Sequence, residues 1–234
     1  MSKFTTIHAL IALIAVGAVA CDKPPADAPK AEVTEVKPTE APKVEEKKVE
    51  EAKPAAAAAA NMTDVAKTST IAWTGYGVGK SHTGDFKVYD GKAAYDKDGN
   101  LQMVKFTVKT DSMTSDSEKL TGHLKSPDFF NVAKFPEATF ESTSIVAKPA
   151  GEYTHEISGK MNMLGVEKVV TFPATVKVEG NKLMADSEFK INRKDFNMTY
   201  GVADTDDLKK KLGDKAINEE VLMKIHVEAP TPKS

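Results

Sequence analysis

Strict alternation of apolar and polar residues dominates the chain after about residue 62. In KVVTFPATVKVEG (residues 168–180) one face carries only apolar side chains, those of Val170, Phe172, Ala174, Val176 and Val178. Threonine, lysine and glutamate occupy most of the other face. A period of two residues is the pattern of a β-strand with one buried and one solvated face. Such a strand is stable only when its apolar face packs against another apolar surface.

Seven further segments alternate in the same way: TIAWT (70–74), GDFKVYDG (84–91), MVKFTVK (103–109), ATFESTSIV (138–146), YTHEISGKMNM (153–163), NKLMADSEFKIN (181–192) and EEVLMKIHVE (219–228). Short turns with glycine or asparagine join most of them, which predicts antiparallel hairpins. About eight such strands can hide one shared apolar face in a closed barrel or in a two-sheet sandwich. We predict an all-β fold, an eight-stranded antiparallel barrel with one or two short helices in its connections.

Two longer connections interrupt the strands. The first, SDSEKLTGHLKSPDFFNVAKFP, begins as a short helix capped by Ser115 or Ser117, and the second is expected to form a helical turn at residues 206–211. The first connection also carries Phe129, Phe130 and Phe135, three of the ten phenylalanines in the chain. Loops usually expose their side chains, so this connection is expected to cover an apolar surface.

The first 20 residues have the features of a bacterial signal peptide. Lys3 precedes the apolar stretch ALIALIAVGAVA (9–20), which is too short to span a bilayer comfortably. Small residues then lead to Cys21 in the sequence AVAC, which resembles a lipobox with Ala18 in the usual leucine position. We predict a lipoprotein signal peptide at residues 1–20 and lipidation of Cys21. The alternative is an ordinary secretory signal that leaves a free Cys21 thiol.

Residues 21–61 consist mainly of Pro, Glu, Lys, Ala and Val and contain no aromatic residue. Such a segment buries too little apolar surface to offset its ordering entropy, so we predict a disordered tether. Residues 62–231 form one barrel domain, followed by a tail at residues 232–234. Cys21 is the only cysteine, so nothing downstream can be a disulfide or a cysteine metal site.

An eight-stranded barrel either fills with its own side chains or holds one small ligand. The residues expected to face its interior are large or flexible and apolar, with a few small ones among them. As ligand-binding candidates they are Trp73, Phe86, Val104, Phe106, Phe129, Phe130, Phe140, Met161, Phe172, Ala174, Val176, Phe189, Ile191, Met223 and Ile225. Periodicity alone leaves open whether they enclose a cavity or a packed core.

The sequence gives no support for a metal site, a catalytic site or a nucleic-acid-binding surface. DKDGN (96–100) begins like a calcium loop, but its glycine comes too early and the closing glutamate is absent. The histidines are dispersed and show no metal-binding spacing, so no metal site is predicted. No nucleophile or phosphate-loop motif occurs, so neither a catalytic residue nor a cofactor is expected. The formal net charge of −2 comes from interspersed charges, which argues against nucleic-acid binding.

The order of motifs resembles that of the YceI family of polyisoprenoid-binding periplasmic proteins. The matching blocks are LKSPDFFNVAKFPEATF (124–140), GKMNMLGVEKVV (159–170) and NRKDF (192–196). Met161 stands where the family usually has leucine. The resemblance implies a lipocalin-like barrel that holds a long isoprenoid chain. Phe129, Phe130 and Phe135 would then plug or line one end of the barrel, or simply complete its core.

The sequence therefore predicts a non-enzymatic, membrane-anchored lipoprotein of the bacterial envelope, facing the periplasm, that sequesters or carries a polyprenyl or quinone-like lipid. Arg193, or Lys194 beside it, is a candidate contact for the polar head group of that lipid, although an Arg193–Asp195 pair is more often structural. The chain is compatible with a homodimer. A ligand-free barrel that acts as a structural or interaction module on the envelope is the alternative.

Overall fold

The computed structural model describes residues 23–36, 62–96, 100–203 and 205–231. Its strands are β1 (Glu32–Glu35), β2 (Met62–Asp64), β3 (Thr70–Gly77), β4 (Lys80–Phe86), β5 (Tyr89–Tyr95), β6 (Leu101–Lys109), β7 (Met113–Ser115), β8 (Glu137–Ala150), β9 (Tyr153–Met163), β10 (Val166–Glu179), β11 (Lys182–Asn192) and β12 (Ile217–Pro230). Its α-helices are α1 (Glu118–Lys125) and α2 (Asp206–Leu212), and short 3-10 turns cover Thr110–Ser112, Arg193–Phe196 and Gly213–Lys215.

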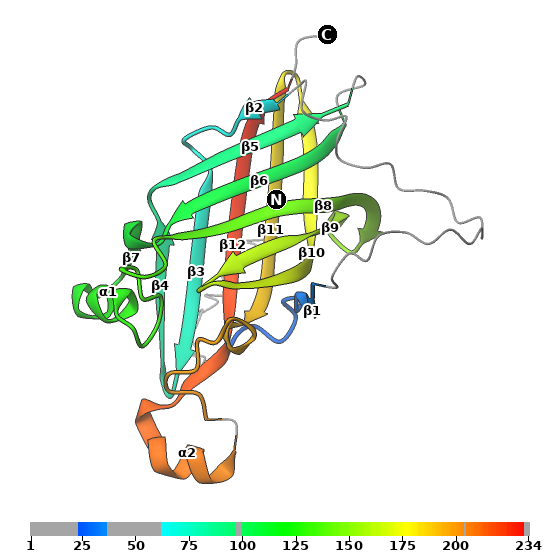
Figure 1. Ribbon diagram of the computed structural model, residues 1–234. Coiled ribbons are helices and arrows are strands. Elements are labelled where there is room, and N and C mark those ends of the chain that lie inside the picture. The colour runs from blue at the N-terminus through cyan, green and yellow to red at the C-terminus, as the bar shows by residue number, and fades with distance from the viewer. Residues whose placement is uncertain (1–22, 37–61, 97–99, 204, 232–234) are drawn as a thin grey trace, which may run out of the picture.

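The strands form one antiparallel sheet in the order β2-β5-β6-β8-β9-β10-β11-β12-β3-β4-β7. The sheet curls on itself, so that β5, β6 and β8 cross in front of β3, β12 and β11 (Figure 1). The chain therefore folds as an all-β, lipocalin-like half-barrel with short helices in its connections, as the alternation predicts. Among the described residues, the strand pairing runs from β2 to β7 without closing the ring.

The number of strands differs slightly from the eight predicted. The segment GDFKVYDG is not one strand but the end of β4, a two-residue link and the start of β5. Lys87 and Val88 form this link without glycine or proline, so the sequence carries no turn signal there. The two helices and the Ser117 cap are as expected: the Ser117 side chain accepts a hydrogen bond from the backbone N–H of Leu120.

The barrel wall divides between β10 and β11. Residues 175–179 of β10 pair with β11. Val166–Ala174 do not pair with β11; one edge of this part of β10 pairs with β9. On the other side, β1 pairs with residues 168–171 of β10. The prediction of a disordered tether is therefore wrong for residues 23–36; residues 37–61 lie outside the described chain, as do the signal peptide and Cys21.

Two apolar clusters form the interior of the half-barrel. One lies between β5, β6, β11 and β12, and the other between β9, β10 and β11. Gly159 on β9 permits the close packing of the second cluster, since a Cβ there would lie 2.5 Å from the Phe140 ring. A third cluster, around Met113, Leu124, Phe129 and Met198, covers the end of the barrel beside α1.

Helix α1 lies beside β4 and β7, at the edge of the sheet where the barrel end opens (Figure 1). Over the residues that the structure describes, no helix is long and apolar enough to cross a membrane. The structured part of the chain is thus a curled sheet with one end covered by α1 and its following loop.

Candidate functional site

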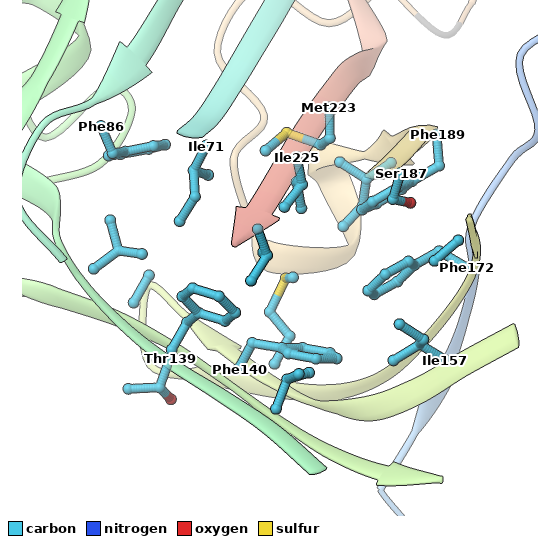
Figure 2. A pocket seen from close by; sticks show the side chains of 18 of the residues that line it. Ile71, Phe86, Thr139, Phe140, Ile157, Phe172, Ser187, Phe189, Met223 and Ile225 are labelled. Carbon is cyan, nitrogen blue, oxygen red and sulfur yellow. The ribbon is translucent and has the colours of Figure 1, made fainter. Parts of the chain in front are cut away.

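A cavity with a volume of about 160 Å³ lies inside the curled sheet, and we call it the apolar chamber. Figure 2 shows side chains from several strands converging on it. Its walls are Ile71, Phe86, Leu101, Val104, Phe106, Val108, Phe130, Ala138, Thr139, Phe140, Ile157, Met161, Met163, Phe172, Ala174, Ala185, Ser187, Phe189, Ile191, Met223, Ile225 and Val227. Apart from Thr139 and Ser187 these side chains are apolar, and the Ser187 hydroxyl donates to the carbonyl oxygen of Pro173.

Strand register explains why these residues meet. Every second residue of a strand points to the same side of a sheet, and directly paired residues share that side. Phe172 of β10 pairs with Ile157 of β9, and Phe189 of β11 pairs with Met223 of β12. The apolar face read from the sequence is therefore the lining of the chamber.

A second cavity of about 350 Å³ lies toward the end covered by α1, and we call it the mouth chamber. Its walls include Trp73, Met113, Leu124, Phe129, Arg193, Met198 and Tyr200. Phe86, Phe130, Met163, Ile191 and Met223 line both chambers. These five shared side chains form the boundary between the two cavities.

The loop after α1 supplies part of that boundary. The Phe130 ring meets the Phe86 ring edge to face at 5.8 Å between centroids. Phe129 is buried against His123, 5.0 Å away, and Tyr200, 5.2 Å away. The paired aromatics thus cover the open end of the barrel, Phe129 as part of a packed end layer and Phe130 between the chambers.

Phe135 has a different role from the one expected. Its side chain lines neither chamber and lies over the β9–β10 turn, where a Cβ on Gly165 would be 2.9 Å from the ring. Gly165 has a φ of 74°, so this position both needs a left-handed backbone and leaves room for the ring. Phe135 therefore fixes the loop to a hairpin and does not plug the barrel.

Arg193 places a charge in the wall of the mouth chamber. The residue is 3% exposed, and its guanidinium donates to the backbone carbonyls of Met198 at 2.8 Å, Asn218 at 3.0 Å and Ile217 at 3.3 Å. Burial lowers the pKa of Arg193 to about 10, while Glu219 acts in the opposite direction, so the group stays charged at neutral pH. Among the described residues, no carboxylate forms an ion pair with it; the expected Arg193–Asp195 pair is not present.

Trp73 faces the same mouth chamber. Its indole nitrogen is buried and has no hydrogen-bond partner within the described chain. A buried N–H without an acceptor is uncommon and costly. The mouth chamber therefore offers an unused donor and a buried cation, and its wall is more polar than that of the apolar chamber, with Lys80, Asp214 and Lys215 also on it.

The structure brings most of the predicted lumen residues together. Those on the walls of the apolar chamber are Phe86, Val104, Phe106, Phe130, Phe140, Met161, Phe172, Ala174, Phe189, Ile191, Met223 and Ile225. Trp73 and Phe129 line the mouth chamber instead, as does Arg193. Val176 packs against both core clusters but lines neither chamber. Whether these residues contact a ligand stays a prediction.

Several lining residues are not among the ligand-binding candidates. Val108, Met163 and Ala185 lie on the apolar faces that the alternation predicts, and Ile71 and Ile157 occupy inward positions of the predicted strands. Leu101 lies at the start of β6, where the alternation is too short to be informative. In the described part of the chain, no group of three or more potential metal ligands comes together.

The model of the YceI-like domain matches residues 61–229. Protein YceI of Salmonella arizonae and that of Salmonella newport are each 37% identical to the chain over 123 residues, covering 50% of this chain and 63% of the relative. The chain thus spans under two thirds of the length of these curated relatives.

Solved structures share the fold. BcnA of Burkholderia cenocepacia superposes with a TM-score of 0.59 at 24% identity, over 71% of this chain and 99% of the other. A polyisoprenoid binding domain from Saccharophagus degradans gives a TM-score of 0.55 at 15% identity, over 74% and 99%. Because the family model covers residues 61–229 of 234, the chain belongs to the YceI-like domain family.

Proposed function

We propose that the protein binds a long isoprenoid-type lipid, such as a polyprenyl or quinone-like molecule, inside the half-barrel. The observation that carries the proposal is the apolar chamber, whose wall is almost free of polar atoms and which shares Phe86, Phe130 and three further wall residues with the mouth chamber. A relative of the same fold is named as a polyisoprenoid binding domain.

Burial of the chain of such a lipid supplies the binding energy. Apolar surface removed from water contributes about 25 cal/mol per Å². A bilayer offers the same gain, so the protein competes with the membrane through the shape of its cavity and through exchange. Flexible Met161, Met163 and Met223 give the wall the adaptability that a long, bent chain requires.

The head group belongs in the mouth chamber. An oxygen-rich or anionic group there would meet the Arg193 guanidinium, which has five N–H donors, of which the backbone carbonyls use three. The free indole N–H of Trp73 lies in the same chamber. This arrangement favours a phosphate or a quinone over a plain hydrocarbon end.

The proposed function includes attachment of the domain to a membrane. Lipidation of Cys21 would place the domain at the periplasmic face of a bacterial membrane, where it would sequester the lipid or carry it. A protein of this kind needs no catalytic residue and no resident cofactor, and we propose neither.

The direct binding test uses all-trans-retinol, an isoprenoid alcohol that accepts excitation energy from tryptophan. Trp73 is the only tryptophan in the chain and lies in the mouth chamber, so energy transfer reports occupation of the barrel itself. We expect saturable transfer from Trp73 to retinol at one site per chain. Transfer that rises without saturation, as for retinol adsorbed on the surface, would contradict the proposal.

A further inference from the structure

We propose that the division between β10 and β11 is a side entrance to the apolar chamber, and that residues 23–36, which we call the strap, bind there as a removable wall strand. The proposal rests on the proposed function, because it concerns how an apolar ligand enters and leaves. The strap lies outside the residues 61–229 matched by the family model.

The entrance exists because two neighbouring strands separate. Ala174 is the last residue of β10 that pairs with β9, and from Thr175 onward β10 pairs with β11. Before that point β10 does not pair with β11, and the edge of β11 at residues 187–192 that faces away from β12 has no strand partner except the bridge between Lys190 and Lys30 of the strap. An unfilled division of this kind would leave two strand edges with unpaired backbone N–H and C=O groups.

The strap fills the division with few bonds. Glu32–Glu35 pair with Lys168–Thr171 of β10 in an antiparallel ladder. On the opposite side, the backbone N–H of Ala31 donates to the carbonyl of Lys190, and the N–H of Lys190 donates to the carbonyl of Pro29, both at 2.8 Å. β1 is thus a short strand between two longer ones and can leave without breaking any other pair of strands.

Outside the barrel, the beginning of the strap is held more loosely. Ala28 covers Tyr76 and Leu222, which are apolar residues on the outer faces of β3 and β12. Lys30 forms a partly exposed ion pair with Glu220 at 3.0 Å. Surface ion pairs of this kind contribute little, about 0–1 kcal/mol.

Only one layer of side chains separates the strap from the chamber. Ala31 is 4% exposed and packs in the same cluster as Phe172, Phe189 and Ile191, three residues of the chamber wall. Phe172 of β10 and Phe189 of β11 stack face to face across the division, 4.4 Å between centroids and 10° between planes. Figure 2 shows both rings on the chamber wall.

The strap seals the entrance without filling the chamber. Its buried residues, Pro24, Ala28 and Ala31, are small, and none of them is part of the chamber wall. Release of the strap would leave the Phe172–Phe189 pair as the remaining barrier. Two aromatic rings can part by side-chain rotation, on a timescale far shorter than that of unfolding.

The strap also sets where the entrance would face. Lys23 follows Cys21 by two residues, which span at most about 7 Å of extended chain. With Cys21 lipidated as proposed, a bound strap holds the barrel close to the membrane with the β10–β11 division nearby. A lipid could then pass between bilayer and chamber without crossing water.

A disulfide that locks the strap in place tests this. Thr34 and Val169 pair directly, while their neighbours Val33 and Val170 point inward, so Thr34→Cys and Val169→Cys place two thiols on the outer face. Cys21→Ser removes the competing thiol. The matched control, Glu188→Cys with Lys224→Cys, joins β11 to β12, which are paired throughout.

The measurement is the rate at which retinol moves from the protein to phosphatidylcholine vesicles, followed by loss of energy transfer from Trp73. We expect the oxidised strap variant to release retinol at least about tenfold more slowly than its reduced form. The equilibrium affinity of the strap variant for retinol should not change with oxidation. The rate of retinol release from the control variant should not change with oxidation either. Equal rates in the oxidised and reduced strap variants would overturn the proposal and indicate exchange through the mouth.

A variant that weakens binding of the strap should have the opposite effect on the rate of retinol transfer. Ala31→Asp places a charge in an apolar cluster and should release the strap, so retinol transfer should accelerate. Thr34→Asp, at an exposed position of the strap in β1, is its control. An unchanged rate in Ala31→Asp would also overturn the entrance. Absence of retinol binding in every form would instead contradict the proposed function, on which the entrance depends.

Discussion

At the scale of single residues, Ala174 distinguishes a ligand cavity from a packed core. It is 1% exposed, lines the apolar chamber and lies between the larger Phe172 and Val176 on the same face of β10. A small side chain among large ones leaves space for a ligand only if neighbouring side chains do not fill that space. Ala174 therefore marks a position where added volume has to compete with a ligand.

We predict that Ala174→Trp keeps the fold and loses ligand binding, because the indole occupies the chamber. Thermal melting by circular dichroism checks the fold, and the fluorescence of retinol itself checks binding. Lys177→Trp, exposed on the same strand, should leave both unchanged. Overpacking of a filled core typically costs about 1–3 kcal/mol. A clearly destabilised Ala174→Trp would therefore contradict the cavity.

Arg193 combines a structural and a binding role. Its three backbone acceptors belong to Met198, Ile217 and Asn218, so it joins the turn after β11 to the start of β12. Lysine cannot reproduce this planar set of donors, and a buried acceptor left without a partner costs about 1–3 kcal/mol. We predict that Arg193→Lys lowers the free energy of unfolding by about 2–4 kcal/mol, measured by urea denaturation.

The control for Arg193 is its neighbour. Lys194 forms a surface ion pair with Glu219 at 3.5 Å. Lys194→Gln should change stability by no more than about 1 kcal/mol. If Arg193→Lys were equally mild, the guanidinium would not hold the mouth chamber together, and its assignment to the head group would lose its structural basis.

At the scale of elements, the loop after α1 separates into residues with different tasks. Phe129 is 6% exposed in the end layer, Phe130 lies between the two chambers, and Phe135 holds the loop to the β9–β10 turn. The sequence showed that this loop covers an apolar surface. It could not assign the three rings, because the loop has no periodicity to fix their directions.

We predict that Phe129→Ala mainly destabilises the protein, by about 3–5 kcal/mol, because it empties a buried position. Phe130→Ala should have the larger effect on ligand retention, since it removes part of the boundary between the chambers. Phe135→Ala, as the control, should lower stability while leaving retention unchanged. Thermal melts and retinol release rates separate these effects, and equal retention in all three variants would contradict the assignment of Phe130.

The strands were predictable where the alternation is long. β10, β11 and β12 each present an apolar face over many residues, and their register follows from that face. The division of residues 84–91 between β4 and β5 was not predictable, because Lys87 and Val88 carry no turn signal. A two-residue link of ordinary residues is fixed by the surrounding sheet and not by local preference.

At the scale of the whole molecule, the strap shows that amino-acid composition alone does not predict whether a segment is ordered. Residues 23–36 are rich in Pro, Ala and charged residues and would not order alone. They gain order from two strand edges, which supply the backbone partners that the segment itself lacks. One signal was present in the sequence: Leu222 is an apolar residue on the polar face of β12, and Ala28 covers it.

The chain as a whole is expected to be anchored through Cys21. We predict that the wild-type protein made in a bacterial host partitions into detergent and carries an acyl modification at Cys21, whereas Cys21→Ser is neither acylated nor normally processed. Phase partitioning and mass spectrometry of the N-terminal peptide measure both properties. A wholly water-soluble wild type with an unmodified thiol would rule out the lipid anchor.

If the proposed function is correct, the half-barrel holds a long apolar lipid in the cell. Native mass spectrometry of the protein purified from envelope fractions, followed by extraction and identification of the bound molecule, tests it most directly. We expect a complex heavier than the chain by one isoprenoid-type lipid, absent from Ala174→Trp and retained by Lys177→Trp. A wild-type protein that is well folded and carries no lipid, with a mass equal to that of Ala174→Trp apart from the substitution, would contradict it.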